Sequence, residues 1–352
     1  MALTVSLRVN NDLTATEAID LALAAEAAGI DQLWISNDLM LRSAPVLLGA
    51  ISQRTTRLRI GTGIMNPYTV HPAELAMAAA TLQEITQGRF LLGLGAGSAE
   101  FLDWVGIAQP TPLTATRQAL RGIRELLRSG RPSQIEGAGP GWTDDARLRF
   151  TPPAEPVPIY IGAMSPRMLA FAGEEADGVL ALHLPPEHLI TAREHVSAGI
   201  RAAGRDESDI DLPACVWLSM DTDPDAAARA LALKLAYYGP AFSPFLLGRA
   251  GLTPEDFVGA ERHLARGDTD AAASAITEQM LRLGICGGPD DVIARCRGLL
   301  ELGVTHLSFG PPLGPDPATT IALLGDVVVP ALRDAQAALA DASSSASKET
   351  PA

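Results

Sequence analysis

The stretch that most constrains the fold combines two strand patterns with a helix pattern between them and ends in a loop that carries glycines. Residues 57–64 alternate and are rich in β-branched side chains, which is typical of a strand. Residues 73–87 carry apolar side chains at helical spacing. Residues 89–94 are nearly all apolar, as expected of a parallel strand that is buried on both faces. Residues 57–98 therefore predict a βαβ unit.

The two loops of this unit, residues 63–71 and 95–98, follow the carboxyl ends of the predicted strands. Parallel strands present these ends at one face of a fold, so we expect the loops to lie side by side there. Strand and helix patterns keep alternating along the chain, and eight strands are predicted, at residues 3–9, 31–36, 57–64, 89–94, 157–161, 177–182, 211–219 and 304–309. This order predicts an α/β fold, a (β/α)8 TIM barrel with insertion segments, with an open, doubly wound sheet as the alternative.

The pattern runs without a linker, so residues 1–334 are predicted to form a single barrel domain. Two excursions from the repeat, at residues 130–155 and 239–270, are predicted to be insertions. Residues 335–352 are polar and rich in small side chains, and we expect a disordered tail there.

The charge balance narrows the range of partners. The chain has 27 basic and 41 acidic residues, and its net charge of -14 disfavours binding to nucleic acid or to an anionic membrane surface. No apolar run approaches the length that spans a bilayer. The three cysteines form no CxxC pair, which favours a cytoplasmic protein without disulfides or structural zinc. We therefore expect a cytoplasmic protein that acts on a small molecule.

The predicted strand ends carry glycine, amide and hydroxyl residues, which suit a large polar cofactor better than a metal or a carboxylate pair. No HExxH motif or carboxylate cluster is present, so no metal site is predicted. The glycines at 93, 95 and 97 do not have the GxGxxG spacing of a dinucleotide fold. Ser165 at a predicted helix start is either an ordinary N-cap or part of a phosphate site. Asp38 is either a hydrogen-bond acceptor for a ligand or a cap for the turn that follows it.

Four segments in order carry a resemblance to a known family. They are TGIMNPYTVHPAELAMAAATLQEITQGRFLLGLGAGS, GIAQPTPLTATRQALRGIRELL, PVPIYIGAMSPRMLAFAGEEADGVL and GGPDDVIARCRGLLELGVTHLSFGPPLGPDP. Together they resemble the luciferase-like superfamily of flavin and deazaflavin oxidoreductases. Within it the chain is most similar to the methylenetetrahydromethanopterin reductase branch, which uses coenzyme F420.

The resemblance implies a barrel that holds a deazaflavin at the carboxyl ends of its strands. It implies a cis peptide bond between Gly63 and Ile64, whose backbone would press on the back of the middle ring. By the same resemblance, the ring and tail would be lined by Asp38, Asn66, Ala96, Gly97 and Ser98. The phosphate would be held by Gly162, Ala163, Met164 and Ser165, with Gly178, Val179 and Leu180 completing that side.

Two positions depart from the reductase pattern. Arg8 and Ser98 stand where that branch has acidic residues. The resemblance therefore supports the same cofactor for this chain more strongly than it supports the pterin substrate. The substrate is expected to be selected by Arg8, Phe101, Trp104, Trp142 and the excursion at residues 239–270.

The sequence thus predicts an enzyme that transfers a hydride between coenzyme F420 and a small organic substrate, such as an imine, an enone or an alcohol. Asp38 or His183 is the candidate to relay a proton. The alternatives are an FMN-dependent luciferase-like monooxygenase and a non-catalytic protein that binds the deazaflavin. By resemblance we also expect a homo-oligomer.

Overall fold

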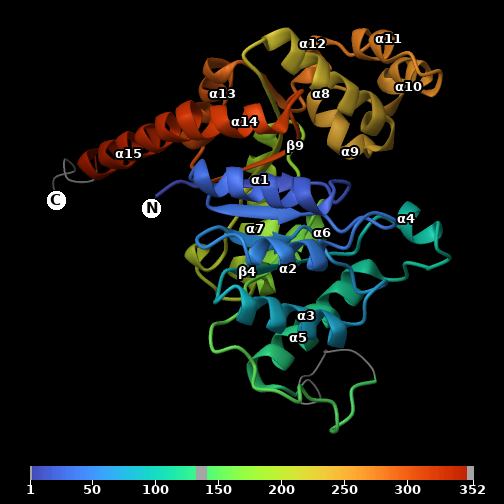
Figure 1. Cartoon of the computed structure of the whole chain (residues 1–352), viewed down its shortest axis with the longest axis vertical. Coiled ribbons are helices and arrows are strands. Elements are labelled where there is room, and N and C mark those ends of the chain that lie inside the picture. The colour runs from blue at the N-terminus through green and yellow to red at the C-terminus, as the bar shows by residue number, and fades with distance from the viewer. Residues whose placement is uncertain (1, 132–140, 347–352) are drawn as a thin grey trace.

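A computed structural model describes residues 2–131 and 141–346 of the chain (Figure 1). Within these residues, nine strands form one parallel sheet in the order β6-β5-β4-β3-β2-β1-β9-β7-β8. The strands are β1 (Thr4–Val9), β2 (Gln32–Ile35), β3 (Arg59–Thr62), β4 (Phe90–Leu94), β5 (Ile159–Gly162), β6 (Gly178–Leu180), β7 (Ala214–Met220), β8 (Ile285–Gly287) and β9 (His306–Leu313).

The sheet closes into a barrel through backbone bonds between the β6 and β7 segments. The amide of Val179 donates to the carbonyl oxygen of Asp211 at 2.9 Å, and the amide of His183 donates to that of Cys215 at 2.8 Å. The predicted barrel fold is confirmed, and the eight predicted strands correspond to β1–β7 and β9. Strand β8 was not predicted, because it is only three residues long and ends in glycine. It pairs with the last three residues of β7.

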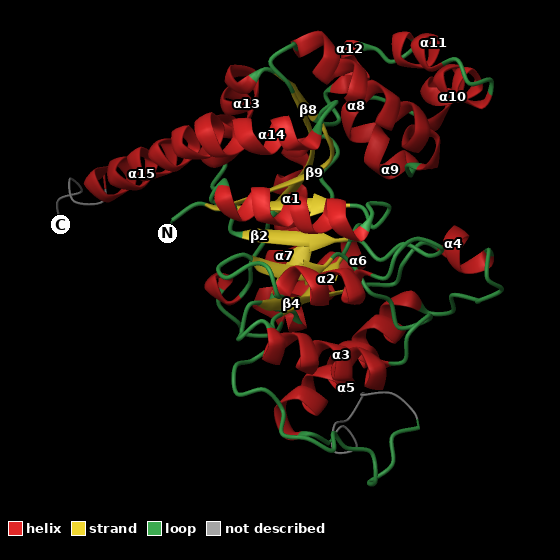
Figure 2. Cartoon of the chain, viewed as in Figure 1, coloured by secondary structure: helices red, strands yellow, loops and turns green. Residues whose placement is uncertain are grey.

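Helices surround the strands, as Figure 2 shows. They are α1 (Ala15–Ala27), α2 (Ala44–Ser52), α3 (Pro72–Ile85), α4 (Ala99–Asp103), α5 (Pro112–Ser129), α6 (Pro166–Glu175), α7 (Leu189–Ala202), α8 (Pro224–Tyr238), α9 (Pro244–Leu247), α10 (Val258–Ala265), α11 (Thr269–Ser274), α12 (Glu278–Leu281), α13 (Pro289–Glu301), α14 (Pro317–Leu323) and α15 (Val329–Ala346). Helices α8–α12 gather at one end of the molecule, and α3 and α5 lie at the opposite end (Figure 1).

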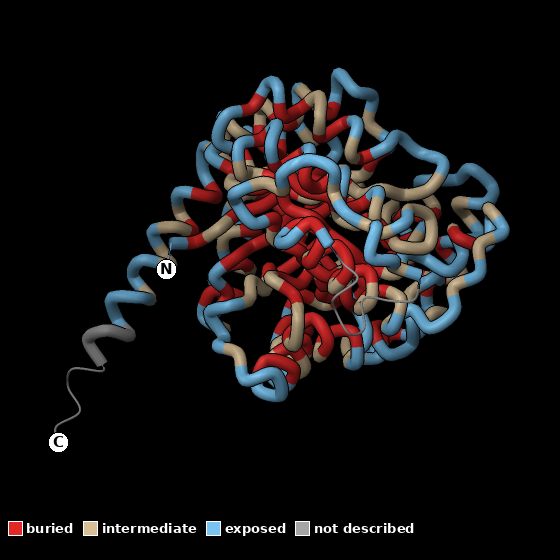
Figure 3. Tube along the Cα trace, turned by 90° about the horizontal axis from the view of Figure 1, so that it is seen from below, coloured by how far each residue is buried: buried red, intermediate tan, exposed pale blue. Residues whose placement is uncertain are grey.

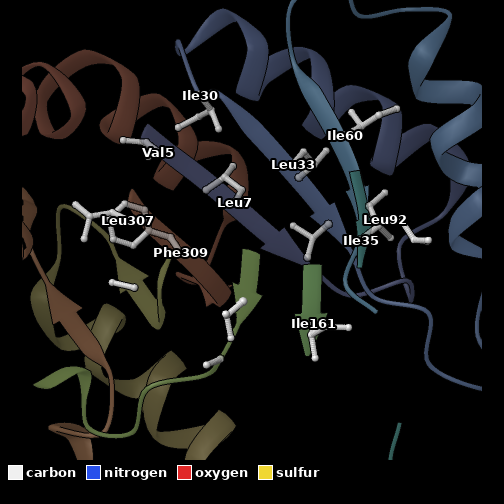
Figure 4. Packing of buried hydrophobic residues seen from close by; sticks show 14 of the residues in the cluster. Val5, Leu7, Ile30, Leu33, Ile35, Ile60, Leu92, Ile161, Leu307 and Phe309 are labelled. Atoms are coloured by element: carbon white, nitrogen blue, oxygen red, sulfur yellow. The ribbon is translucent and has the colours of Figure 1, made fainter. Parts of the chain in front are cut away.

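The main core lies between the strands and the surrounding helices, and Figure 3 shows the buried chain gathered in the middle of the molecule. Alternate side chains of each strand point outward into this layer, among them Val5, Leu7, Leu33 and Ile35 (Figure 4). Burying one such side chain stabilises the fold by about 1.5–3 kcal/mol. The strand pattern therefore determines which residues are left to face the barrel interior.

The interior at the amino ends of the strands is filled by a polar network. The hydroxyl of Tyr160 donates to Oδ2 of Asp211 at 2.8 Å. The same oxygen lies 2.7 Å from Nδ1 of His306, whose Nε2 lies 2.9 Å from the Ser6 hydroxyl. These side chains occupy the interior near the amino ends of the strands, and sites in folds of this type lie at the carboxyl ends.

Two predicted irregular segments differ in the structure. The excursion at residues 239–270 contains helices α9 and α10. Residues 335–346, which we expected to be disordered, continue helix α15, because this alanine-rich stretch consists largely of good helix formers. Figure 1 shows α15 extending away from the body. Residues 132–140 of the other excursion and residues 347–352 of the tail lie outside the described residues.

Candidate functional site

A cavity of about 170 Å³ lies at the mouth of the barrel, where the carboxyl ends of β1, β2, β3 and β7 meet helix α8. A larger cavity of about 670 Å³ lies by α12 and α13 and contains none of the predicted site residues. We place the site at the barrel mouth, because enzymes of this architecture carry their chemistry there. The cavity is lined by Arg8, Val9, Asn10, Trp34, Ser36, Gly63, Trp217, Lys234, Tyr238 and Pro311.

The two glycine-bearing loops lie side by side at this mouth, as predicted. The amide of Met65 donates to the carbonyl oxygen of Gly93 at 2.8 Å, and the amide of Gly95 donates to that of Met65 at 2.9 Å. The peptide bond between Gly63 and Ile64 is cis. Gly63 reaches the cavity directly.

The glycines at the ends of β4 and β5 make room for the side chain of Ile64. A β-carbon added to Gly95 or Gly162 would lie 3.2 or 3.1 Å from carbons of Ile64. A β-carbon on Gly93 would lie only 1.9 Å from the carbonyl oxygen of Thr62. The glycines therefore serve close packing between loops rather than a dinucleotide cradle.

Asn66 and Gln109 hold the loop at residues 95–98 in place. The side-chain oxygen of Asn66 accepts hydrogen bonds from the amides of Tyr68 and Thr69, which fixes its own loop. Gly97 has a φ of +75°, and a β-carbon there would lie 2.9 Å from Nδ2 of Asn66. The side-chain amide of Gln109 donates to the carbonyl oxygens of Ala96 and Gly97 at 2.8 and 3.1 Å. Ser98 follows this pair and is exposed.

The end of β5 leads into a helix N-terminus that is open to an anion. Ala163 is buried, Met164 and Ser165 are exposed, and the Ser165 hydroxyl accepts a hydrogen bond from the amide of Met168 at 3.4 Å. The first turn of α6 carries no acidic side chain. Because free amides and the helix dipole favour negative charge at such an end, these residues fit a phosphate group.

The three predicted site residues of β6 do not all lie near the barrel mouth. Gly178 begins the strand, and a β-carbon there would lie 2.1 Å from the Tyr160 ring, so this glycine accommodates Tyr160. Val179 is buried in the main core. Leu180 alone of the three approaches the mouth, since its Cδ1 lies 3.9 Å from a β-carbon built on Gly63.

Of the two proton-relay candidates, the structure favours Asp38 over His183. Ser36, which lines the cavity, donates to the Asp38 carboxylate, and burial raises the pKa of that carboxyl. His183 is fully buried, and its Nε2 lies 3.3 Å from the carbonyl oxygen of Pro213. Burial lowers the pKa of His183 to about 3, so the ring is neutral. Its burial away from the cavity lining argues against the relay that the sequence suggested.

The aromatic side chains that were expected to select the substrate do not line this cavity. Phe101 and Trp104 contact each other, with ring centres 4.6 Å apart, and Trp104 is 58% exposed. Trp142 packs 5.3 Å from His71. The aromatic residues of the cavity are instead Trp34, Trp217 and Tyr238, which the sequence analysis missed. Periodicity cannot separate such residues from ordinary core positions.

Comparison with known proteins identifies the family. Residues 3–306 match the family model described as luciferase-like monooxygenase. The chain belongs to this family. It is 35% identical over 315 residues to a 5,10-methylenetetrahydromethanopterin reductase of Archaeoglobus fulgidus, covering 88% of this chain and 93% of the relative. It is 31% identical over 338 residues to an F420-dependent glucose-6-phosphate dehydrogenase of Nakamurella multipartita, covering 90% of this chain and 93% of the relative.

Solved structures of the luciferase-like family agree with this fold. The coenzyme F420-dependent tetrahydromethanopterin reductase from Methanopyrus kandleri superposes with a TM-score of 0.85 at 30% identity, covering 94% of this chain and 99% of the other. An F420-dependent secondary alcohol dehydrogenase in complex with an F420–acetone adduct shares the fold, with a TM-score of 0.76 at 23% identity, and the alignment covers 95% of this chain and 100% of the other.

Within this luciferase-like chain, Arg8 is held by backbone and hydroxyl groups. Its Nη2 donates to the carbonyl oxygen of Val216 at 2.8 Å, and its Nε donates to the Ser308 hydroxyl at 3.2 Å. A β-carbon on Gly310 would lie 2.6 Å from Nη2, so the guanidinium rests on this glycine. Arg8 thus places a fixed positive charge in the cavity wall.

The described residues, 2–131 and 141–346, show neither a metal cluster nor a membrane-spanning helix. They contain no group of three or more His, Cys, Asp or Glu side chains that could hold a metal ion. Among them there is also no helix that is both long and apolar enough to span a membrane.

Proposed function

We propose that this protein is a coenzyme F420-dependent oxidoreductase that transfers a hydride between the deazaflavin and a small organic substrate. The observation that carries the proposal is similarity along nearly the whole chain to F420-dependent enzymes whose substrates differ, a pterin in one group and a sugar phosphate in another. Their shared property is the cofactor, which is therefore the property that the similarity supports for this chain.

The residues at the mouth suit the parts of this cofactor. Gly63 and Ile64 would back the ring, because Gly63 reaches the cavity and Ile64 is held by the glycines around it. Asp38 and Leu180 would lie at the ring edge. The loop at residues 95–98, fixed by Asn66 and Gln109, would run along the tail. The first turn of α6 at Ser165, together with Gly162, Ala163 and Met164, would hold the phosphate.

When bound, the deazaflavin supplies or accepts a hydride, that is, a hydrogen nucleus with two electrons. The protein's part is to hold one face of the ring against the loop at residues 63–71 and to leave the other face to the substrate. An imine, an enone or an alcohol meets this requirement. Because Arg8 lies in the wall and Ser98 in the loop, where the reductase branch has acids, we propose a substrate other than the pterin.

Cofactor titration tests this proposal. Purified protein is titrated with F420 and, separately, with FMN, and fluorescence quenching reports binding. We expect saturable binding of F420. Tight binding of FMN with none of F420 would overturn the proposal and would favour a flavin monooxygenase.

The reaction is tested with a panel of compounds, by mixing protein loaded with oxidised F420 with 2-propanol, glucose 6-phosphate and other alcohols, and protein loaded with reduced F420 with methylenetetrahydromethanopterin, imines and enones. Absorbance of the deazaflavin follows hydride transfer in each direction. Tight F420 binding without exchange with any of these compounds would point instead to a non-catalytic deazaflavin-binding protein.

A further inference from the structure

The basic residues of this chain are almost all arginines. Of its 27 lysines and arginines, only Lys234 and Lys348 are lysines. Arginine remains protonated in proteins, whereas lysine loses its proton readily when it is desolvated. A lysine at position 234 is therefore unusual in this chain. Its surroundings show whether the site uses a property that arginine lacks.

Lys234 lines the mouth cavity together with Gly63. It lies on α8, and its Nζ is 4.4 Å from the ring centre of Tyr238 and 5.4 Å from that of Trp217. The structure assigns Nζ no hydrogen bond or ion pair within residues 2–131 and 141–346. The ammonium group is thus held by aromatic faces and left available to a ligand.

The charges around Lys234 come from three other segments. Asp12 and Asp38, from the loops after β1 and β2, favour the protonated ammonium, whereas Arg8 of β1 disfavours it. Tyr238 and Tyr237 lie beside it on α8. Burial is the largest effect and lowers the pKa of Lys234 to about 8. Such a group exchanges its proton near neutral pH, which an arginine at this place could not do.

We infer that Lys234 is the proton-transfer residue of this enzyme, acting on the substrate atom next to the carbon that gains or loses the hydride. The inference rests on the proposed function. As the substrate carbon accepts a hydride from the bound deazaflavin, which is thereby oxidised, the π electrons of the C=O or C=N bond move to oxygen or nitrogen. That atom takes a proton from the Lys234 ammonium, and the neutral amine regains a proton from water.

The other polar groups at the mouth are less suited to this step. Arg8 is held by three acceptors and does not release its proton. Asp38 accepts a hydrogen bond from Ser36 and would have to be protonated to act as an acid. Tyr238 also lines the cavity, but burial raises the pKa of its hydroxyl further above neutral pH, whereas burial brings the pKa of Lys234 down towards it.

The near absence of other lysines makes a direct test possible. Reductive methylation with 13C-formaldehyde labels only the N-terminal amine, Lys234 and Lys348, and NMR follows each signal against pH. We expect the Lys234 signal to titrate near 8, below the ordinary lysine value of about 10.4. Addition of F420 should shift this signal. Titration of the Lys234 signal at the ordinary lysine value, with no response to F420, would overturn the inference.

Variants supply a second test. Lys234→Arg keeps the positive charge but cannot release a proton, and Lys234→Met removes the charge. We expect both to lower kcat by about 100-fold or more, with the substrate that the panel identifies. Arg229→Met, which removes a cation from the same helix, is the matched control and should keep full activity. Full activity of Lys234→Arg would contradict the inference.

The two proposals fail in different ways. If F420 does not bind the unmodified protein, the proposed function fails, whatever Lys234 does. If F420 binds to the wild type and to Lys234→Arg with equal affinity, and both turn over equally, the cofactor assignment stands and only the role of Lys234 is rejected.

Discussion

The hydroxyl of Ser36 donates to Oδ2 of Asp38 over 3.3 Å, and the backbone amide of Asp38 donates to the side chain of Asn11 at 3.2 Å. Asp38 is therefore fixed at the mouth by its own backbone, while its half-buried carboxylate accepts one long hydrogen bond from among the described residues. These contacts hold the carboxylate in position but do not fully compensate the free energy that it loses when it is removed from water.

Asp38→Asn should separate stability from function. Since burial raises the pKa of Asp38, the folded state binds the proton more tightly than the unfolded chain does, and its stability falls as pH rises from 3.8 through the folded pKa. The neutral amide removes this penalty, so urea unfolding at neutral pH should show equal or greater stability, by up to about 1 kcal/mol. F420 affinity or turnover should fall. A clear loss of stability would contradict this account.

The pH dependence of the reaction should follow Lys234. Reduction of a C=O or C=N bond needs the protonated ammonium, so kcat/KM in that direction should fall as pH rises through about 8. Oxidation of an alcohol needs the neutral amine and should rise over the same range. Steady-state rates in both directions check this, and Lys234→Arg should lose the transition in each.

Ser165→Asp should weaken cofactor binding without weakening the fold. Aspartate caps a helix as well as serine does, and its charge favours a helix N-terminus, so the melting temperature should not fall. The added carboxylate would repel a phosphate at the first turn of α6, and F420 affinity should drop tenfold or more, by rough analogy with other charge repulsions at binding sites. Unchanged affinity in the fluorescence titration would place the phosphate elsewhere.

Gly93→Ala should be among the most destabilising small substitutions. Its β-carbon would overlap the Thr62 carbonyl oxygen, at 1.9 Å, inside a parallel sheet that cannot shift locally. We expect a loss of about 3 kcal/mol or more. Gly49→Ala is the matched control, because Gly49 lies in helix α2 with nothing within 4 Å of the added carbon. That change should stabilise by about 0.5–1 kcal/mol, as measured by urea unfolding.

Glu26 ties α1 to the segment before β3. Its carboxylate accepts hydrogen bonds from the amides of Thr56, Arg57 and Leu58, and these bonds lower its pKa to about 2 despite some burial. Because the folded pKa lies below the ordinary 4.5, the stabilisation is present above that pH and is lost as pH falls towards 2. Glu26→Gln should cost about 1 kcal/mol at neutral pH, after allowance for solvent screening. The difference from the wild type should shrink steadily in acid.

Much of the barrel could be predicted because its signal is local. Residues 3–9 alternate between apolar and polar side chains, residues 89–94 are nearly all apolar, and the Thr14 capping box can be recognised from two residues. Strand β8 was missed because its three residues end in Gly287 and are followed by Gly288, whereas the equally short β6 continues into the apolar residues Ala181 and Leu182. Helix α15 was not predicted beyond residue 334, because small polar residues indicate disorder. The alanines among them favour a helix, since alanine is the best helix former.

Gly63, Asn66 and Ser165 follow shortly after their strands, so the resemblance could assign them to the carboxyl ends of the barrel as a prediction. The cavity residues of β7 and α8 could not be found in that way. Lys234 lies 14 residues after the end of β7, on a helix whose apolar stripe gives no sign that one position faces the barrel mouth. Its only signal was compositional, since Lys234 is one of two lysines in the chain.

Strand β7 and helix α8 bring Trp217, Lys234 and Tyr238 to the cavity from one continuous piece of chain, and Phe242 of the next segment packs 5.4 Å from Trp217. The loops proposed to hold the deazaflavin come from other pieces. If the proposed function holds, substitutions within residues 214–242 should change the substrate and leave the cofactor site intact. A family built this way can acquire new substrates by replacement of residues 214–242. Grafting this segment between relatives is a practical way to change the substrate.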